Sequence, residues 1–147
     1  MNLSASLPAL ERILLTLWVG SLWVTGFMVA PVLFAVLEDR AMAGTLAGRM
    51  FSNTAWIGMV CGCVLLVLNG VQYRTLNWRG LLLAGMLLLI VAGQFVLTPM
   101  IAGLRDQGLV DTPRFGQLHG LAGVVYIVTS LCGLLLVAAR PGKPSGQ

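Results

Sequence analysis

The chain has 147 residues, of which 58% are hydrophobic and 10% are charged, and its formal net charge is +4. A typical soluble domain is about 25% charged. A chain this apolar would lack the polar helices needed to cover a soluble core, which excludes an ordinary soluble domain. We predict an integral membrane protein whose main partner is the lipid bilayer. Membrane topology accounts for the positive charge, and we expect no nucleic-acid partner.

Four long windows of the sequence contain no Asp, Glu, Lys or Arg. About 20 apolar residues are enough for a helix to cross the hydrocarbon core, and the windows lack the period-two alternation of membrane β-strands. The predicted fold class is therefore an all-α integral membrane protein, a four-transmembrane-helix bundle in one domain, residues 1–147. The first window is longer than the apolar region of a signal peptide, and we expect it to be retained. The predicted spans are about 13–37, 50–73, 80–104 and 115–139.

Local signals refine the ends of these helices. Thr112 followed by Pro113 is typical of an N-cap and the first helical position, so the fourth helix should begin there. The apolar segment 41–50 is predicted either to continue the second helix or to lie at the membrane interface. The C-terminal segment 141–147 is predicted to be disordered.

An internal repeat appears when the sequence is compared with itself at the fixed offset that aligns Pro31 with Pro99. Each unit is one helical hairpin with a proline near the end of its outgoing helix, followed by an acidic turn. Two similar hairpins in tandem form a parallel repeat, whose pseudo-two-fold axis runs along the membrane normal. The other pairs that coincide at this offset are Phe27 with Phe95, Glu38 with Asp106, and Gly48 with Gly116.

Three glycine pairs have the G-x-x-x-G spacing that lets helix backbones approach closely in lipid. This spacing predicts tight helix packing but does not distinguish contacts within one chain from contacts in a homo-oligomer, which stays an alternative. The pairs are Gly44 and Gly48, Gly58 and Gly62, and Gly116 and Gly120.

Pro31 and Pro99 interrupt otherwise continuous helices, because each removes a backbone hydrogen bond and clashes with the preceding turn. One interpretation is a simple packing kink. The other is that freed carbonyl groups near residues 27 and 95 line a polar vestibule, where irregular backbone is tolerated at membrane depth. Gln94 and Thr98 precede Pro99 on one helix face, and Ser21 and Thr25 precede Pro31 in the same way.

His119 is the sole histidine, and it lies inside the fourth predicted span. Ionisable residues within spans are candidates for function, although His119 is only about one and a half turns from the preceding loop. Helical spacing places it on one face with Gly123, Tyr126 and Ser130. If this face meets those of Gln94 and Thr25, the stripes form a small polar pocket. The alternative is separate hydrogen bonds between helices.

We expect no metal or cofactor. Cys61 and Cys63 are two apart and point to nearly opposite faces of a helix, so they cannot chelate one ion. Seven methionines leave copper as a minor alternative, and haem with His/Met ligation is another. The sequence lacks H-E-x-x-H, G-x-S-x-G and phosphate-loop motifs, so an enzyme is not expected. The tryptophans Trp18, Trp23, Trp56 and Trp78 are mostly expected in interfacial belts.

The first hairpin contains the run from Leu17 to Phe34, with Trp23, Gly26 and Pro31, and the second contains Phe115-Gly116-Gln117-Leu118-His119. These segments resemble a bacterial membrane family of unknown function, the transmembrane-protein-205-like type. More distantly the chain is similar to CopD-type copper-resistance proteins and HemJ-type oxidases, although residues 13–20 lack the early histidine of the HemJ pattern. This resemblance implies the bacterial cytoplasmic (inner) membrane as the location.

Both termini lie on one side of the membrane if there are four spans. The terminal segments and the 74–79 loop carry five Lys or Arg residues, against four in the other two loops, so the positive-inside rule favours cytoplasmic termini. We predict a protein that binds or passes a small solute or ion through an outward-facing pocket. The alternatives are a HemJ-type redox enzyme and an assembly subunit.

Overall fold

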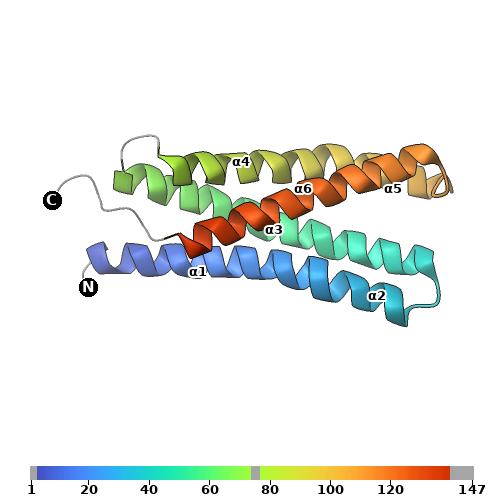
Figure 1. Ribbon diagram of the computed structural model, residues 1–147, viewed down its shortest axis with the longest axis horizontal. Helices are drawn as coiled ribbons and strands as arrows, with labels where there is room; N and C mark the ends of the chain where they lie inside the picture. The colour runs from blue at the N-terminus through green and yellow to red at the C-terminus, as the bar shows by residue number, and fades with distance from the viewer. Residues whose placement is uncertain (1–2, 74–76, 140–147) are drawn as a thin grey trace.

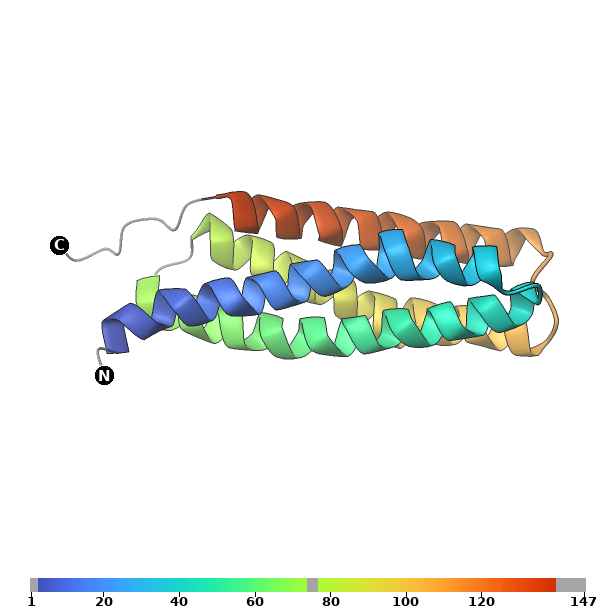
Figure 2. The same ribbon diagram turned by 90° about the horizontal axis from the view of Figure 1, so that it is seen from below.

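The computed structural model describes residues 3–73 and 77–139, and every regular element in them is a helix. Four helical rods run side by side along the molecule (Figures 1 and 2). The predicted all-α four-helix bundle is therefore confirmed, whereas the predicted disorder of 141–147 lies outside the described residues. The elements are α1 (Leu3–Val24), η1 (Thr25–Val29), α2 (Ala30–Val36), α3 (Arg40–Tyr73), α4 (Trp78–Ala92), η2 (Gly93–Leu97), α5 (Thr98–Asp106) and α6 (Pro113–Ala138), where η denotes a π-helical turn.

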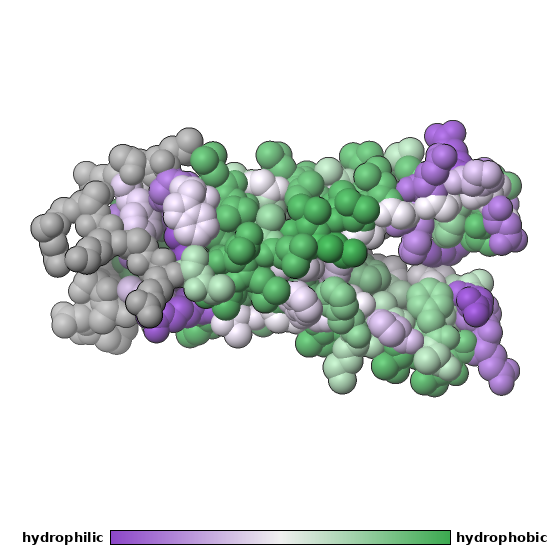
Figure 3. All heavy atoms as spheres, in the orientation of Figure 1, coloured by the Kyte–Doolittle hydropathy of each residue, from purple (hydrophilic) through white to green (hydrophobic). Residues whose placement is uncertain are grey.

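The rods have the length and surface of membrane spans. Each contains a stretch of low charge and high hydropathy long enough to cross a bilayer. Large apolar side chains point outward; Val36 and Leu88, for example, are more than two-thirds exposed. Figure 3 shows a hydrophobic band between a hydrophilic end and the opposite end of the bundle. The protein is thus a multi-pass membrane protein embedded in lipid.

The bundle has two distinct ends (Figure 1). We call the end with the α2–α3 and α5–α6 turns the hairpin end, and the end where α1 begins and α6 ends the terminal end. At the hairpin end, Asp39 Oδ1 accepts a hydrogen bond from the Ala41 backbone N–H (2.8 Å), and the Thr112 side chain accepts one from the Phe115 N–H (3.3 Å). These side chains cap α3 and α6. The predicted start at Pro113 and the helical continuation through 41–50 are both confirmed.

The two prolines follow π-helical turns that occupy equivalent positions of the two hairpins, at Thr25–Val29 and Gly93–Leu97. In each turn a backbone N–H reaches beyond the usual α-helical partner, from Ala30 to the Thr25 carbonyl and from Thr98 to the Gly93 carbonyl. Proline has no N–H group, and the widened turn accommodates the backbone hydrogen bond that is lost at each proline. The predicted interruption near residues 27 and 95 is confirmed, and its form is a π-helical bulge, a feature frequent at functional sites.

Buried positions repeat with the same offset as the prolines, which supports two similar hairpins packed around a pseudo-two-fold axis. Trp18, expected in an interfacial belt, is instead fully enclosed at the centre of the core. Gly58 and Gly62 of α3 leave the room that its indole occupies, because a Cβ at either position would lie within about 3.0 Å of the ring. Equivalent buried residues are Leu15 and Leu83, Trp18 and Met86, Leu22 and Ile90, and Cys61 and Thr129.

An ion pair joins the two hairpins at the terminal end. Arg79 Nη2 donates to Glu11 Oε1 at 2.8 Å, and Arg79 Nη1 donates to the Ala139 carbonyl at 3.0 Å. The two charged side chains are only 5% and 14% exposed. Glu11 and Arg79 are separated by the same offset that relates Pro31 to Pro99, so the pair bridges equivalent positions of the two hairpins across the pseudo-symmetry axis.

Candidate functional site

The two hairpins separate at the hairpin end. In the terminal half of the bundle α3 packs on α4 and α1 packs on α6, which joins the hairpins. Beyond the π-helical turns α2 packs on α3 and α5 packs on α6, whereas described contacts between these two pairs are sparse. Figure 3 shows a hollow between the pairs at this end. We call it the hairpin-end cleft.

A layer of polar contacts crosses the bundle at the level of the π-helical turns. Thr25 and Thr54 hydroxyls lie 2.8 Å apart in a buried contact, and Gln94 Nε2 donates to Ser52 Oγ at 2.8 Å. The Tyr126 hydroxyl donates to the Leu22 carbonyl and thereby joins α6 to α1. This layer forms the floor of the cleft, because the apolar core begins on its terminal side.

Tyr126 is held in this layer by contacts with Leu22, Phe51 and Gly26. Its ring contacts Phe51 edge-to-face with centroids 4.9 Å apart, a favourable aromatic geometry. A Cβ at Gly26 would lie 2.5 Å from Tyr126 Cε1, so only glycine leaves room for the ring. Tyr126 therefore reaches the backbone of the opposite hairpin through a gap that Gly26 provides.

We predict that Thr25 and Thr54 are energetically coupled. Thr25→Val or Thr54→Val alone should destabilise the protein by about 1 kcal/mol, because the remaining buried hydroxyl loses its partner. The double variant should cost less than the sum of the two single variants. A double-mutant cycle of unfolding in detergent measures this coupling; strictly additive effects would contradict it.

Arg105 lies at the mouth of the cleft and reaches from α5 to α3. Its guanidinium lies about one van der Waals contact from where Cβ atoms would stand at Gly44 (3.5 Å) and Gly48 (3.6 Å). The side chain is partly buried and forms no ion pair within the described residues. The Gly44 and Gly48 pair thus accommodates an arginine rather than another helix backbone.

The other two glycine pairs have opposite surroundings. Cβ atoms at Gly58 and Gly62 would overlap Trp18 and Leu87, so this pair packs inside the bundle. At Gly116 and Gly120 a Cβ would meet nothing within 4 Å. In the described part of the chain, Gly116 and Gly120 therefore do not pack closely against another helix.

The predicted pocket residues are only partly brought together. Thr25, Gln94 and Tyr126 contribute to the polar layer, and Pro31 and Pro99 follow the π-helical turns that shape it. Thr98 Oγ1 instead donates to the Gly93 carbonyl of its own helix at 3.0 Å. The predicted convergence of all stripes is therefore replaced by separate pairwise hydrogen bonds.

His119 lies apart from this layer. It is exposed on α6, with its ring stacked parallel to Phe115 at a centroid distance of 5.9 Å. No hydrogen bond or ring contact links it to Gln94 or Tyr126 in the part of the chain that the structure describes. His119 and Tyr126, predicted on one polar face of α6, are separated because Tyr126 points toward α1 while His119 faces outward.

The different exposure of Cys61 and Cys63 agrees with the prediction that they lie on different faces of one helix. Cys61 is buried, Cys63 is exposed, and all three cysteines are free thiols. Among residues 3–73 and 77–139, no group of three or more His, Cys, Asp or Glu side chains is placed to hold a metal ion.

Sequence reasoning missed Ser52, Thr54 and Arg105. A local signal for the first two exists, since Ser52-Asn53-Thr54 is a polar interruption near the start of an apolar window. Arg105 gives no such signal, because its contact with Gly44 joins residues of different hairpins.

One family model matches residues 13–109, which run from the middle of α1 to just beyond α5 and include both π-helical turns and the cleft floor contributed by α3. Comparison with curated proteins and with solved structures finds no match. The resemblances to transmembrane-protein-205-like, CopD-type and HemJ-type proteins stay predictions. Because the match covers well over half of the chain, the protein belongs to the family described as Domain of unknown function (DUF4149).

Proposed function

We propose that this membrane protein binds a small anionic solute in the hairpin-end cleft. The observation that carries the proposal is Arg105, a partly buried residue whose guanidinium reaches across to Gly44 and Gly48 of α3 and has no carboxylate partner among the described residues. Taking a cation out of water is costly unless an opposite charge compensates it. An anion entering the cleft supplies that charge through charge-assisted, bidentate hydrogen bonds.

The cleft floor offers neutral groups that complement this charge. Ser52 and Gln94 hold each other through one hydrogen bond, which leaves the Gln94 carbonyl oxygen and the second amide hydrogen for a ligand. An anion carrying a hydroxyl or a protonated oxygen would use both kinds of group. The proposed ligand class is therefore a small phosphate, sulfate or carboxylate compound.

Binding is better supported than free passage. The terminal half is filled by Trp18, Leu22, Met86 and Leu136, each at most 2% exposed. Among the described residues this core is mostly apolar, with Thr129 and Ser130 as buried polar members, so transport would require the hairpins to move apart. The π-helical turns beside the cleft are the places where such movement would begin.

We also propose that the cleft opens away from the cytoplasm, in the inner membrane of a bacterium. Cytoplasmic termini follow from the positive-inside count of Lys and Arg, and the cleft lies at the opposite end of the bundle. The ligand would then be drawn from the extracytoplasmic side.

The test is a thermal-shift titration of purified protein with inorganic phosphate, sulfate and succinate. Binding to the folded state raises Tm by mass action, by an amount equivalent to about 2.7 kcal/mol at one hundred times Kd. At least one of these anions should raise Tm of the wild-type protein. Arg105→Gln should abolish that shift, because the neutral amide cannot replace the charge.

Arg40→Gln is the matched control, since Arg40 is an exposed arginine at the same end of the bundle. It should leave the anion-dependent shift intact. Absence of a shift with all three anions, or a shift that survives Arg105→Gln, would refute the proposal. Absorption spectra and metal analysis of the same samples test the copper and haem alternatives, which a coloured or metal-containing protein would favour.

A further inference from the structure

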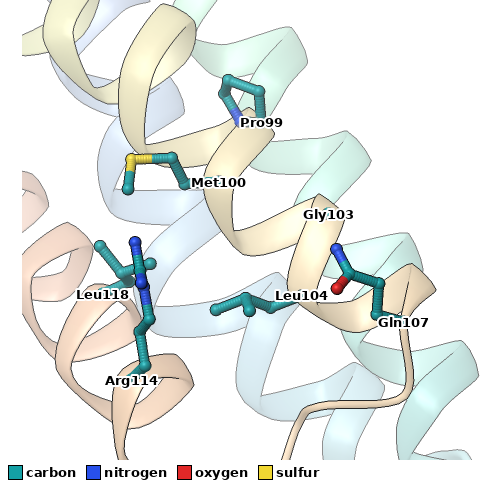
Figure 4. A pocket seen from close by; sticks show the side chains of 7 residues that line it. All are labelled: Pro99, Met100, Gly103, Leu104, Gln107, Arg114 and Leu118. Atoms are coloured by element: carbon teal, nitrogen blue, oxygen red, sulfur yellow. The ribbon is translucent and has the colours of Figure 1, made fainter.

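A second concave site lies in the groove between α5 and α6 (Figure 4), and Arg105 is not among the residues that line it. Its volume is about 240 Å³, and its lining residues Pro99, Met100, Gln107 and Arg114 are exposed on the surface of the bundle. We call it the α5–α6 groove. It is lined by Pro99, Met100, Gly103, Leu104, Gln107, Arg114 and Leu118.

The lining residues lie at different distances from the α5–α6 turn. Gln107 and Arg114 lie next to the α5–α6 turn, while Pro99 and Met100 lie farther into the apolar part of the bundle. At the usual helical rise, the separation of Pro99 and Gln107 in the sequence corresponds to about 12 Å, a length that part of an acyl chain can cover. The groove therefore presents apolar side chains together with Arg114, whose side chain extends from the α5–α6 turn along the groove toward Met100 (Figure 4).

A groove that faces lipid does not stay empty, because its lining would lose dispersion contacts. Two occupants are conceivable, an acyl chain or a helix from a second copy. Arg114 forms no ion pair in the described part of the chain. A second copy packed over the groove would desolvate this charge without compensating it, whereas a phospholipid brings a phosphate to the same depth.

We propose that the α5–α6 groove is a specific phospholipid site. One acyl chain lies along Met100, Leu104 and Leu118, and the lipid phosphate accepts hydrogen bonds from Arg114. Arginine suits this role, because its guanidinium binds phosphate in bidentate geometry. This site is separate from the solute cleft and does not depend on it.

Two variants test separately how the charge and the apolar trough contribute to lipid binding. Arg114→Gln removes the phosphate partner and leaves the trough open. Gly103→Leu adds a side chain to the trough and keeps the charge, and its Cβ would meet nothing within 4 Å. Arg40→Gln and Gly116→Leu are the matched controls, since Arg40 is exposed, Gly116 is equally open, and neither lines the groove.

The experiment is native mass spectrometry of the protein purified in detergent and titrated with phosphatidylglycerol. Wild-type protein and both controls should retain one lipid at a collision energy that removes the others. Arg114→Gln and Gly103→Leu should each weaken retention about tenfold, the effect of losing one charge-assisted contact or one buried chain segment. Glycerol phosphate, which has no acyl chain, should not compete at equal concentration.

Three results would overturn the proposal. The first is unchanged lipid retention in both groove variants. The second is competition by glycerol phosphate as effective as that by the lipid, which would identify a free-phosphate site. The third is a dimer in wild-type protein that Gly103→Leu converts to monomer, which would identify an interface between two copies.

Discussion

Glu11→Ala should destabilise the bundle by about 3–5 kcal/mol, because it leaves the buried Arg79 guanidinium without a counter-charge. The pair is closed by a 2.8 Å contact between Arg79 Nη2 and Glu11 Oε1, and Arg79 is only 5% exposed at its side chain. Its remaining hydrogen bond, to the Ala139 carbonyl, does not neutralise the charge. Equilibrium unfolding in mixed micelles measures the loss.

The double variant Glu11→Leu with Arg79→Met is the informative control. Apolar residues of similar size remove both charges together, so most of the lost stability should return. If the double variant is as unstable as Glu11→Ala, the effect comes from lost packing and the electrostatic explanation is wrong.

The location of this pair follows from the repeat. Residues at equivalent positions of two hairpins approach each other near a pseudo-two-fold axis, so identical charges there would repel. Glu11 and Arg79 are equivalent positions that carry opposite signs, and the asymmetry turns a repulsive contact into an attractive one. The same pair fixes the hairpins together at the terminal end, opposite the cleft.

Gly58→Ala should cost about 1–3 kcal/mol, the usual effect of overpacking a core. The new Cβ would lie 2.5 Å from Trp18 Nε1 and 2.9 Å from Ile90 Cδ1. Trp18 is completely buried and cannot move aside. A lower Tm in detergent should report this strain.

Gly116→Ala is the matched substitution in an open environment. Its Cβ meets nothing within 4 Å, and alanine favours helix over glycine by up to about 1 kcal/mol. Tm should therefore stay the same or rise. Equal destabilisation by the two variants would contradict the assignment of Gly58, rather than Gly116, to packing within the chain.

The fold was largely predictable because membrane insertion is governed by local composition. Charge-free windows defined the four spans, and Pro31 and Pro99 marked the places where helical hydrogen bonding changes. The offset between these two prolines predicted the two hairpins, and the buried positions follow it. Each of these signals acts over one helix or one repeat.

The candidate site was less predictable because it depends on contacts between hairpins. Tyr126 reaches Leu22 only because Gly26 leaves space on a distant helix, and helical spacing alone placed His119 beside Tyr126. Arg105 was counted as a loop charge, yet it lies on Gly44 and Gly48 across the cleft. Helical spacing in the sequence shows on which face of a helix a side chain lies. Tertiary packing decides which residue of another helix meets that face.

The measurement that tests the central claim most directly is water access to the hairpin-end cleft. In a variant without native cysteines, Gly48→Cys introduces a thiol at a position whose Cβ would lie 3.6 Å from the Arg105 guanidinium, and Val60→Cys introduces one at a lipid-facing position where the native valine is 64% exposed. A charged, membrane-impermeant thiol reagent should modify Gly48→Cys in intact membranes, and a bound anion should slow the reaction. Val60→Cys should stay unmodified. If Gly48→Cys is as inert as Val60→Cys, the cleft is closed and the proposed solute site does not exist.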